Sequence, residues 1–177
     1  MDNLQVIEYG LGPAAILLLL AYHVYLFYRT RRDPLSTSIG LAHRTRALWV
    51  RSIMKNNKDI LAVQTLRNWT MASTFLASTA IIIGLGIFNL ALTADKQGEL
   101  SLLIGPLSID HPVLWTTKLV ILGIDFLIVF FNFTLAVRYY NHTGFMINLP
   151  TDEPGVVSIE GVIKILDRGG THYTLGM

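Results

Sequence analysis

Three polar residues interrupt the most apolar part of the chain, and their spacing places them on one side of a helix. Lys118, Asp125 and Asn132 lie seven residues apart within the apolar stretch 113–137. On an ideal helix each lies about 20° further around the axis than the one before, so the three form a polar stripe. Near the middle of a membrane span a carboxylate costs about 2.5–3.5 kcal/mol, so Asp125 must be protonated, paired or in contact with water. The stripe is therefore either a proton or ion site, or a hydrogen-bonding contact between helices.

The histidines and the absence of cysteine bound the cofactor chemistry. With no cysteine in the chain, disulfides and thiolate metal sites are excluded. His23 is the one histidine inside an apolar stretch, and haem ligation requires a second histidine at matching depth on another helix. Only His142 is expected near the same surface. We predict no cofactor and no metal site, and keep haem held by His23 and His142 as an alternative.

Basic residues gather between the first two apolar stretches. Arg44, Arg46 and Arg51, with Trp49 among them, are suited to hold the phosphate of an anionic lipid. The alternative is the ordinary excess of positive charge on the cytoplasmic side of a membrane protein. No catalytic triad order, zinc-binding spacing, phosphate-binding glycine loop or nucleic-acid-binding pattern is present. The sequence predicts no catalytic residue and favours a protein that is not an enzyme.

The composition requires that these residues be positioned by membrane helices. Of the 177 residues 52% are hydrophobic and only 15% are charged, where soluble domains have about a quarter charged. A spanning helix needs about 20 mostly apolar residues. Three stretches qualify, at about 9–28, 69–92 and 113–137. The sequence predicts an all-α polytopic transmembrane helical bundle with three spans, which forms a single membrane domain over residues 1–177.

The placement of lysine and arginine predicts the orientation. Nine of the fourteen basic residues lie in the loop 29–68, whereas the loop 93–112 holds only Lys96. Because basic loops remain cytoplasmic, we expect 29–68 and the C-terminal segment 138–177 inside, and 93–112 and the N-terminus outside. A bacterial inner membrane would suit this arrangement.

Two segments on the cytoplasmic side have amphipathic periodicity, at 41–58 and 156–168. Each is expected to be a helix that lies in the membrane interface or, equally, one that packs on the inner ends of the spans. The pair Gly169-Gly170 is predicted to end the second helix. Within the second span, three pairs of small residues four apart predict close helix packing: Ser73 and Ala77, Thr74 and Ser78, and Ala80 and Gly84.

Four blocks of the sequence resemble an uncharacterised family of membrane proteins from bacteria and plants, described only as a domain of unknown function. They are Ala21–Leu26, Arg46–Val50, Asp59–Asn68 with Met71–Thr74 after it, and Leu135–Asn141. The resemblance implies a protein with four spans, of which the last would begin near Tyr173–Gly176, so that this C-terminal span is absent here. It implies no activity.

Together these patterns predict a structural or accessory component of a membrane assembly. Its partners would be the lipid bilayer and either other membrane subunits or further copies of the same chain, with no nucleic acid. One alternative is an oligomeric transporter or channel that uses the stripe of Asp125. A further alternative is a haem-binding redox subunit of the membrane.

Overall fold

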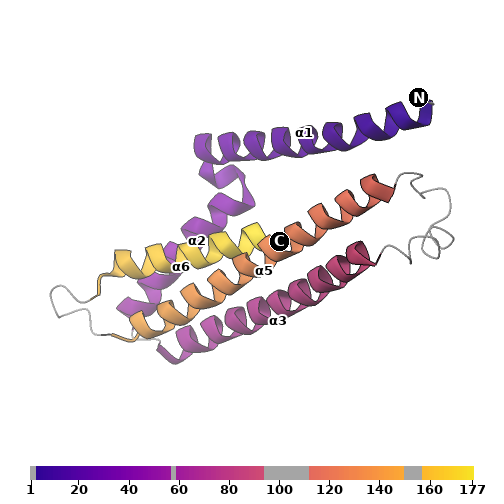
Figure 1. Cartoon of the computed structure of the whole chain (residues 1–177). Helices are drawn as coiled ribbons and strands as arrows, with labels where there is room; N and C mark the ends of the chain where they lie inside the picture. Colours follow the sequence, from indigo (N-terminus) through magenta and orange to yellow (C-terminus); the bar gives the residue numbers. More distant parts are fainter. Residues whose placement is uncertain (1–2, 57–58, 94–111, 150–156) are drawn as a thin grey trace. The chain divides into compact units, whose positions relative to one another are not determined.

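The structure, a computed structural model, describes residues 3–56, 59–93, 112–149 and 157–177. This part of the chain is all-helical, as predicted, and contains no strand (Figure 1). Its elements are α1 (Asn3–Arg32), the 3-10 helix η1 (Pro34–Ser36), α2 (Ser38–Lys55), α3 (Asp59–Leu92), α5 (Pro112–Met146) and α6 (Ile159–Gly176). They divide into two compact units, Met1–Leu48 and Trp49–Met177.

In the first unit, a tight turn joins α1 to α2. Thr37 caps the start of α2, where its hydroxyl accepts a hydrogen bond from the backbone N–H of Gly40 at 3.2 Å. The hydroxyl of Thr30, in the last turn of α1, donates to the same oxygen at 3.2 Å. A Cβ at Gly40 would lie 1.9 Å from the carbonyl oxygen of Pro34, so only glycine permits this turn.

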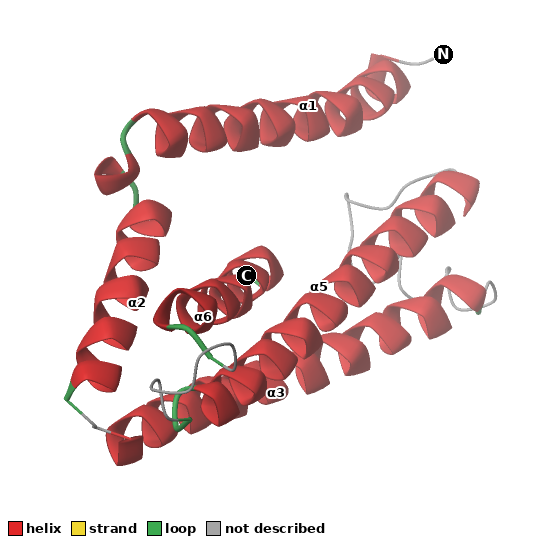
Figure 2. Ribbon diagram, turned by 90° about the vertical axis from the view of Figure 1, so that its left-hand side faces the viewer, coloured by secondary structure: helices red, strands yellow, loops and turns green. Residues whose placement is uncertain are grey.

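In the second unit, α3 and α5 lie side by side along a seam of small residues (Figure 2). A Cβ at Gly84 would lie 3.2 Å from Cβ of Phe126, and a Cβ at Gly123 would lie 2.9 Å from the ring of Phe88. Since Gly84 faces Phe126 while Phe88 faces Gly123, the two helices run antiparallel. Such close approach of two backbones requires small side chains.

The seam confirms two of the three predicted small-residue pairs. Ser73 and Ala77 are buried, as are Ala80 and Gly84. Thr74 and Ser78 are exposed, so this pair does not pack against α5. The hydroxyl of Ser73 donates to the carbonyl oxygen of Trp69 at 2.8 Å, which satisfies it within α3.

The helix α6 runs antiparallel to α5 and packs against it through glycines (Figure 1). A Cβ at Gly169 would lie 2.9 Å from the ring of Tyr140, and a Cβ at Gly176 would lie 3.0 Å from the ring of Phe133. The prediction that Gly169-Gly170 ends the helix is therefore wrong. Both glycines are buried inside α6, where the absence of a side chain lets the helix approach the aromatic rings of α5.

Part of the amphipathic face of each of the two segments, 41–58 and 156–168, is buried in protein, although Leu48 of α2 is exposed. Val50 and Ile53, near the end of α2, belong to one core cluster with Val162 and Leu166 of α6. Tyr140 of α5 is buried in the same cluster. Of the two interpretations of these segments, the structure supports helices that pack on other helices.

Two helices of the described part of the chain are long and apolar enough to cross a membrane. They are the stretches Ile60–Leu92 of α3 and Trp115–Met146 of α5, which contain the second and third predicted spans. Only 22% and 17% of their most apolar segments are buried, so the described residues leave most of each segment uncovered. The first predicted span, 9–28, falls within α1, which is not one of the two. The later part of α1 mixes three tyrosines, a histidine and three arginines into the apolar sequence.

The end of α5 differs from the end of the third predicted span. The helix α5 continues past Val137 to Met146, so the predicted C-terminal segment 138–177 begins inside it. The predicted outer loop 93–112 lies, apart from Thr93 and Pro112, outside the described residues.

Candidate functional site

The face of α5 that carries the polar stripe continues toward the C-terminal end of the helix. Tyr139 and Met146 follow Lys118, Asp125 and Asn132 at the same spacing of seven. The helix α6 covers the second half of this series. A Cβ at Gly161 would lie 3.9 Å from Met146 and one at Gly169 would lie 3.2 Å from Cβ of Tyr139.

Asn132 is bound to α6 through a histidine. Nδ1 of His172 lies 3.0 Å from Oδ1 of Asn132, and the imidazole stacks on the ring of Tyr139 with centroids 5.5 Å apart. The amide nitrogen of Asn132 donates to the carbonyl oxygen of Ile128 at 2.9 Å, so its oxygen is left to accept. His172 must therefore carry its proton on Nδ1. This histidine, expected in a loop, supplies a polar contact between two helices.

Lys118 and Asp125 lie on the half of the stripe that α6 does not reach. Both side chains are exposed, and among the described residues neither has a hydrogen bond or an ion pair. The last residue of α6, Gly176, lies against Phe133. Asp125 is about 10 Å further along the axis than Asn132, at about 1.5 Å per residue. The stripe thus has a half covered by α6 and a half that no described residue pairs with.

An aromatic cluster joins α3, α5 and α6 beside the covered half. The ring of Trp69 meets that of Tyr173 edge-on at 5.1 Å and lies 6.3 Å from that of Tyr140. Tyr173 also meets Phe133 edge-on at 5.6 Å. Aromatic pairs at these distances each stabilise packing by about 0.5–1.5 kcal/mol beyond the area that they bury. The cluster fixes α6 on the other two helices.

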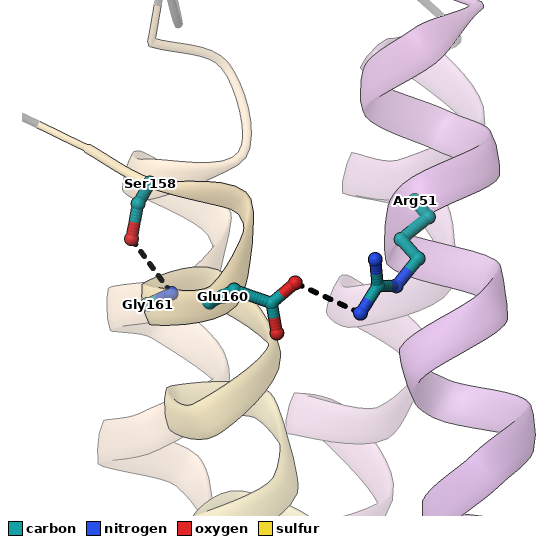
Figure 3. Close-up of polar contacts among 4 residues, drawn as sticks. All are labelled: Arg51, Ser158, Glu160 and Gly161. Atoms are coloured by element: carbon teal, nitrogen blue, oxygen red, sulfur yellow. Dashed lines mark hydrogen bonds and ion pairs between the residues drawn. The ribbon is translucent and has the colours of Figure 1, made fainter.

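The three arginines predicted to contact lipid have different surroundings. Nη2 of Arg51 forms an ion pair with Oε1 of Glu160 at 2.8 Å, at the start of α6 (Figure 3). Beside it, the hydroxyl of Ser158 accepts from the backbone N–H of Gly161 at 3.0 Å and caps that helix (Figure 3). Arg44 is exposed and Arg46 is half-buried. At about 100° per residue Arg46 lies on the opposite side of α2 from Arg44, so the three do not converge on one ligand.

The two haem candidates belong to different units. Nδ1 of His23 lies 2.8 Å from the carbonyl oxygen of Leu19 in its own helix, and the side chain is exposed. His142 is exposed on α5. Within the described residues, no group of three or more histidine, aspartate or glutamate side chains is placed to hold a metal ion.

Two open grooves flank the C-terminal half of α5. The α3–α5 groove has a volume of about 500 Å³. Its walls are Val63, Leu66, Arg67, Thr70, Met71, Tyr140, Asn141, Gly144, Phe145 and Asn148. The α5–α6 groove, of about 730 Å³, is lined by Thr134, Leu135, Val137, Arg138, Tyr139, Asn141, His142, Phe145 and Ile165. Asp125 lines neither of them. The sequence predicted neither groove, since Arg67 at the start of an apolar stretch signals a basic residue near a membrane surface but not the groove beside it.

The fold and the stripe define the class: an all-helical protein with two helices that could span a membrane and an uncovered carboxylate on one of them. Residues 11–177 match the family described as Protein of unknown function, DUF599, and the chain belongs to this family. The predicted resemblance to a domain-of-unknown-function family is confirmed. No curated protein and no solved structure matches the chain.

Proposed function

We propose that the protein is a structural component of a membrane assembly, in which the face of α5 around Asp125 binds a helix of another subunit. One observation carries this proposal. The stripe that holds α6 through Asn132 continues to Asp125, where the described residues provide no partner. The same face of one helix thus has a covered half and an uncovered half.

The cost of an uncovered carboxylate supports a partner helix. In the hydrocarbon region Asp125 would destabilise the inserted chain by about 2.5–3.5 kcal/mol unless it is paired or protonated. A hydroxyl, amide or histidine side chain on a neighbouring helix would remove this cost, as His172 does for Asn132. This face of α5 therefore already binds one helix, α6, through a polar contact.

The proposal includes α1 as a third span, with the N-terminus outside and the basic segments on the cytoplasmic side, as in a bacterial inner membrane. Leu17, Leu18, Leu19 and Leu20 are all exposed, as a span in contact with lipid would require. Tyr22, Tyr25 and Tyr28 would form an aromatic belt near the inner surface, and Arg29, Arg31 and Arg32 follow in the last turn.

The second candidate function is transport of protons or cations through an oligomer. Asp125 favours it for the same reason, because an exposed carboxylate in an apolar helix is also what an ion pathway requires. The two functions differ in whether the charge or only the hydrogen bond of Asp125 is needed.

Two substitutions at Asp125 separate these functions. Asp125→Asn keeps a hydrogen-bonding side chain, so the assembly should be recovered from mild detergent as in the wild type. Asp125→Leu should weaken association by a few tenths of a kcal/mol to about 2 kcal/mol. Thr79→Leu, which makes an exposed position of α3 apolar, is the matched control and should change nothing.

Ion flux into liposomes is measured on the same proteins. Equal recovery of the assembly with Asp125→Leu and with the wild type would contradict helix docking. Flux in the wild type that disappears in Asp125→Asn, while the assembly remains intact, would establish transport instead.

A further inference from the structure

We infer that the α3–α5 groove binds an anionic diacyl phospholipid, with the phosphate held at Arg67. This inference rests on the proposed membrane location but not on the docking role of Asp125. At about 500 Å³, the groove is large enough for a headgroup and the glycerol beneath it, since ligand pockets have volumes of about 300–1,000 Å³.

Exposed apolar side chains of α3 extend the groove at one end. Because α3 and α5 are antiparallel, Val63 lies toward the Asn148 end of the groove and Met71 toward the Tyr140 end. Met71 and, one turn further along α3, Phe75 are exposed apolar side chains that extend the wall toward the hydrocarbon region. Arg67 and Asn148 lie on the cytoplasmic side of this wall, together with the apolar Val63 and Phe145.

Arg67 carries the charge that a phosphate requires. Its side chain is exposed, and within the described part of the chain it forms no ion pair or hydrogen bond. It lies two residues before the predicted span 69–92, whose first residue, Trp69, has the interfacial position typical of tryptophan. An arginine at this depth meets the phosphates of the inner leaflet, and its guanidinium can hold two phosphate oxygens at once.

Side-chain amides supply further donors. Nδ2 of Asn148 donates one proton to the carbonyl oxygen of Gly144 at 3.1 Å, which leaves its second proton for a ligand. Asn141 is exposed and lines both grooves. These amides line the same groove as the arginine and would add hydrogen bonds without adding charge.

The neighbouring groove favours an anionic headgroup over a zwitterionic one. Arg138 and His142 line the α5–α6 groove, and Asn141 and Phe145 separate it from the α3–α5 groove. A choline group would bring a positive charge toward this basic region, whereas the glycerol of phosphatidylglycerol would not. The inference is therefore specific to lipids with a net negative charge.

Native mass spectrometry of the full chain in mild detergent tests this inference. The protein is offered equal amounts of dioleoyl phosphatidylglycerol and dioleoyl phosphatidylcholine. Wild-type protein should retain phosphatidylglycerol in excess, and Arg67→Gln should reduce the retention about tenfold, because a hydrogen-bonded charge is lost. Lys164→Gln removes the same charge from an exposed site on α6 and should leave retention unchanged.

A second variant fills the groove without changing charge. A Cβ at Gly144 has only Cδ1 of Leu66 near it, at 3.9 Å, so Gly144→Leu fits its helix while its outer atoms occupy the groove. Retention should again fall about tenfold if these atoms exclude a glycerol that a charged contact holds. Gly86→Leu is the matched control, since a Cβ at Gly86 meets nothing within 4 Å. Circular dichroism and gel filtration of each variant establish that it is folded.

Several outcomes would overturn the inference. The first is a wild-type protein that retains both lipids equally. The second is unchanged lipid retention in folded Arg67→Gln protein. Because Arg67 forms no ion pair or hydrogen bond within the described part of the chain, this substitution breaks no such contact inside the protein. The third is displacement of the lipid by millimolar inorganic phosphate, which would show that the charge alone binds. If a variant loses the lipid while the assembly remains intact, the proposed role of Asp125 is unaffected. Lipid binding at Arg67 and helix docking at Asp125 can therefore be contradicted independently.

Discussion

Glycine performs the same task at three positions of the Trp49–Met177 unit, where it lets a helix backbone rest against an aromatic ring. Gly123 meets Phe88 in this way, Gly169 meets Tyr140, and Gly176 meets the ring of Phe133. A glycine inside a helix costs about 1 kcal/mol relative to alanine, so each position needs a compensating contact. The rings supply it through dispersion and through the close approach of the helices.

A methyl group at Gly169 tests this account. Gly169→Ala places a Cβ 2.9 Å from the ring of Tyr140, which is buried and lies tilted against Trp69, so it cannot move freely. Overpacking of this kind should destabilise the fold by about 1–3 kcal/mol. The measurement is the midpoint of thermal unfolding in detergent, followed by circular dichroism.

Gly86→Ala provides the contrast of opposite sign. A Cβ there meets nothing within 4 Å, so the substitution should be neutral or stabilising by up to about 1 kcal/mol through helix propensity. Equal midpoints for the two variants would contradict a packing role for Gly169.

At the scale of residues, the sequence predicts which side chains make polar contacts better than it predicts the residues that they contact. The polar stripe through Asn132 was predictable, because helical spacing alone defines it. Its partner His172 was not, because it is forty residues away and the helix that carries it was expected to end at Gly169-Gly170. A glycine that ends a helix and a glycine that packs against a ring look the same in one sequence.

At the scale of elements, amphipathic periodicity predicted helices at α2 and α6 but could not distinguish lipid from protein as their apolar surroundings. The structure supplies the missing contacts. Val50 of α2 and Val162 of α6 are fully buried in the same cluster. The ion pair between Arg51 and Glu160 lies at the edge, with 56% and 68% of the two side chains exposed.

The buried cluster, and not the ion pair, should hold these helices in place. Leu166→Ala removes a buried side chain of α6 and should cost about 2–5 kcal/mol. Arg51→Gln breaks an exposed ion pair and should cost less than about 1 kcal/mol. Thermal unfolding of the two variants side by side measures the difference, and a larger loss in Arg51→Gln would reverse this ranking.

At the scale of the whole molecule, the proposed topology has a direct test. The chain has no cysteine, so a single introduced thiol reports its own position without background. Ser36→Cys, in η1, should react with an impermeant reagent only from the cytoplasmic side, and Ser101→Cys only from outside. Ser101 lies outside the described residues. Labelling of both thiols from one side would contradict the orientation and the number of spans together.

The sequence predicted that α3 and α5 could span a membrane, but it did not predict where α5 ends. Length and apolar content identify α3 and α5 as helices that could span a membrane. They could not show that α5 continues to Met146, because the residues after Val137 are polar enough to read as a loop and are helical through packing. The grooves beside α5 depend on that continuation, so they were beyond prediction as well.

The way α6 rests on α5 has a consequence for biogenesis. Four of the first ten residues of α6 are charged, so this helix has little tendency to enter a bilayer unaided. Ribosomes release α5 first, and its aromatic rings then form the surface that the glycines of α6 require. In the proposed arrangement α6 therefore docks on the cytoplasmic end of α5 only after α5 is in the membrane. A substitution that disrupts the aromatic face of α5 would leave the glycine face of α6 without its packing partner at the cytoplasmic surface.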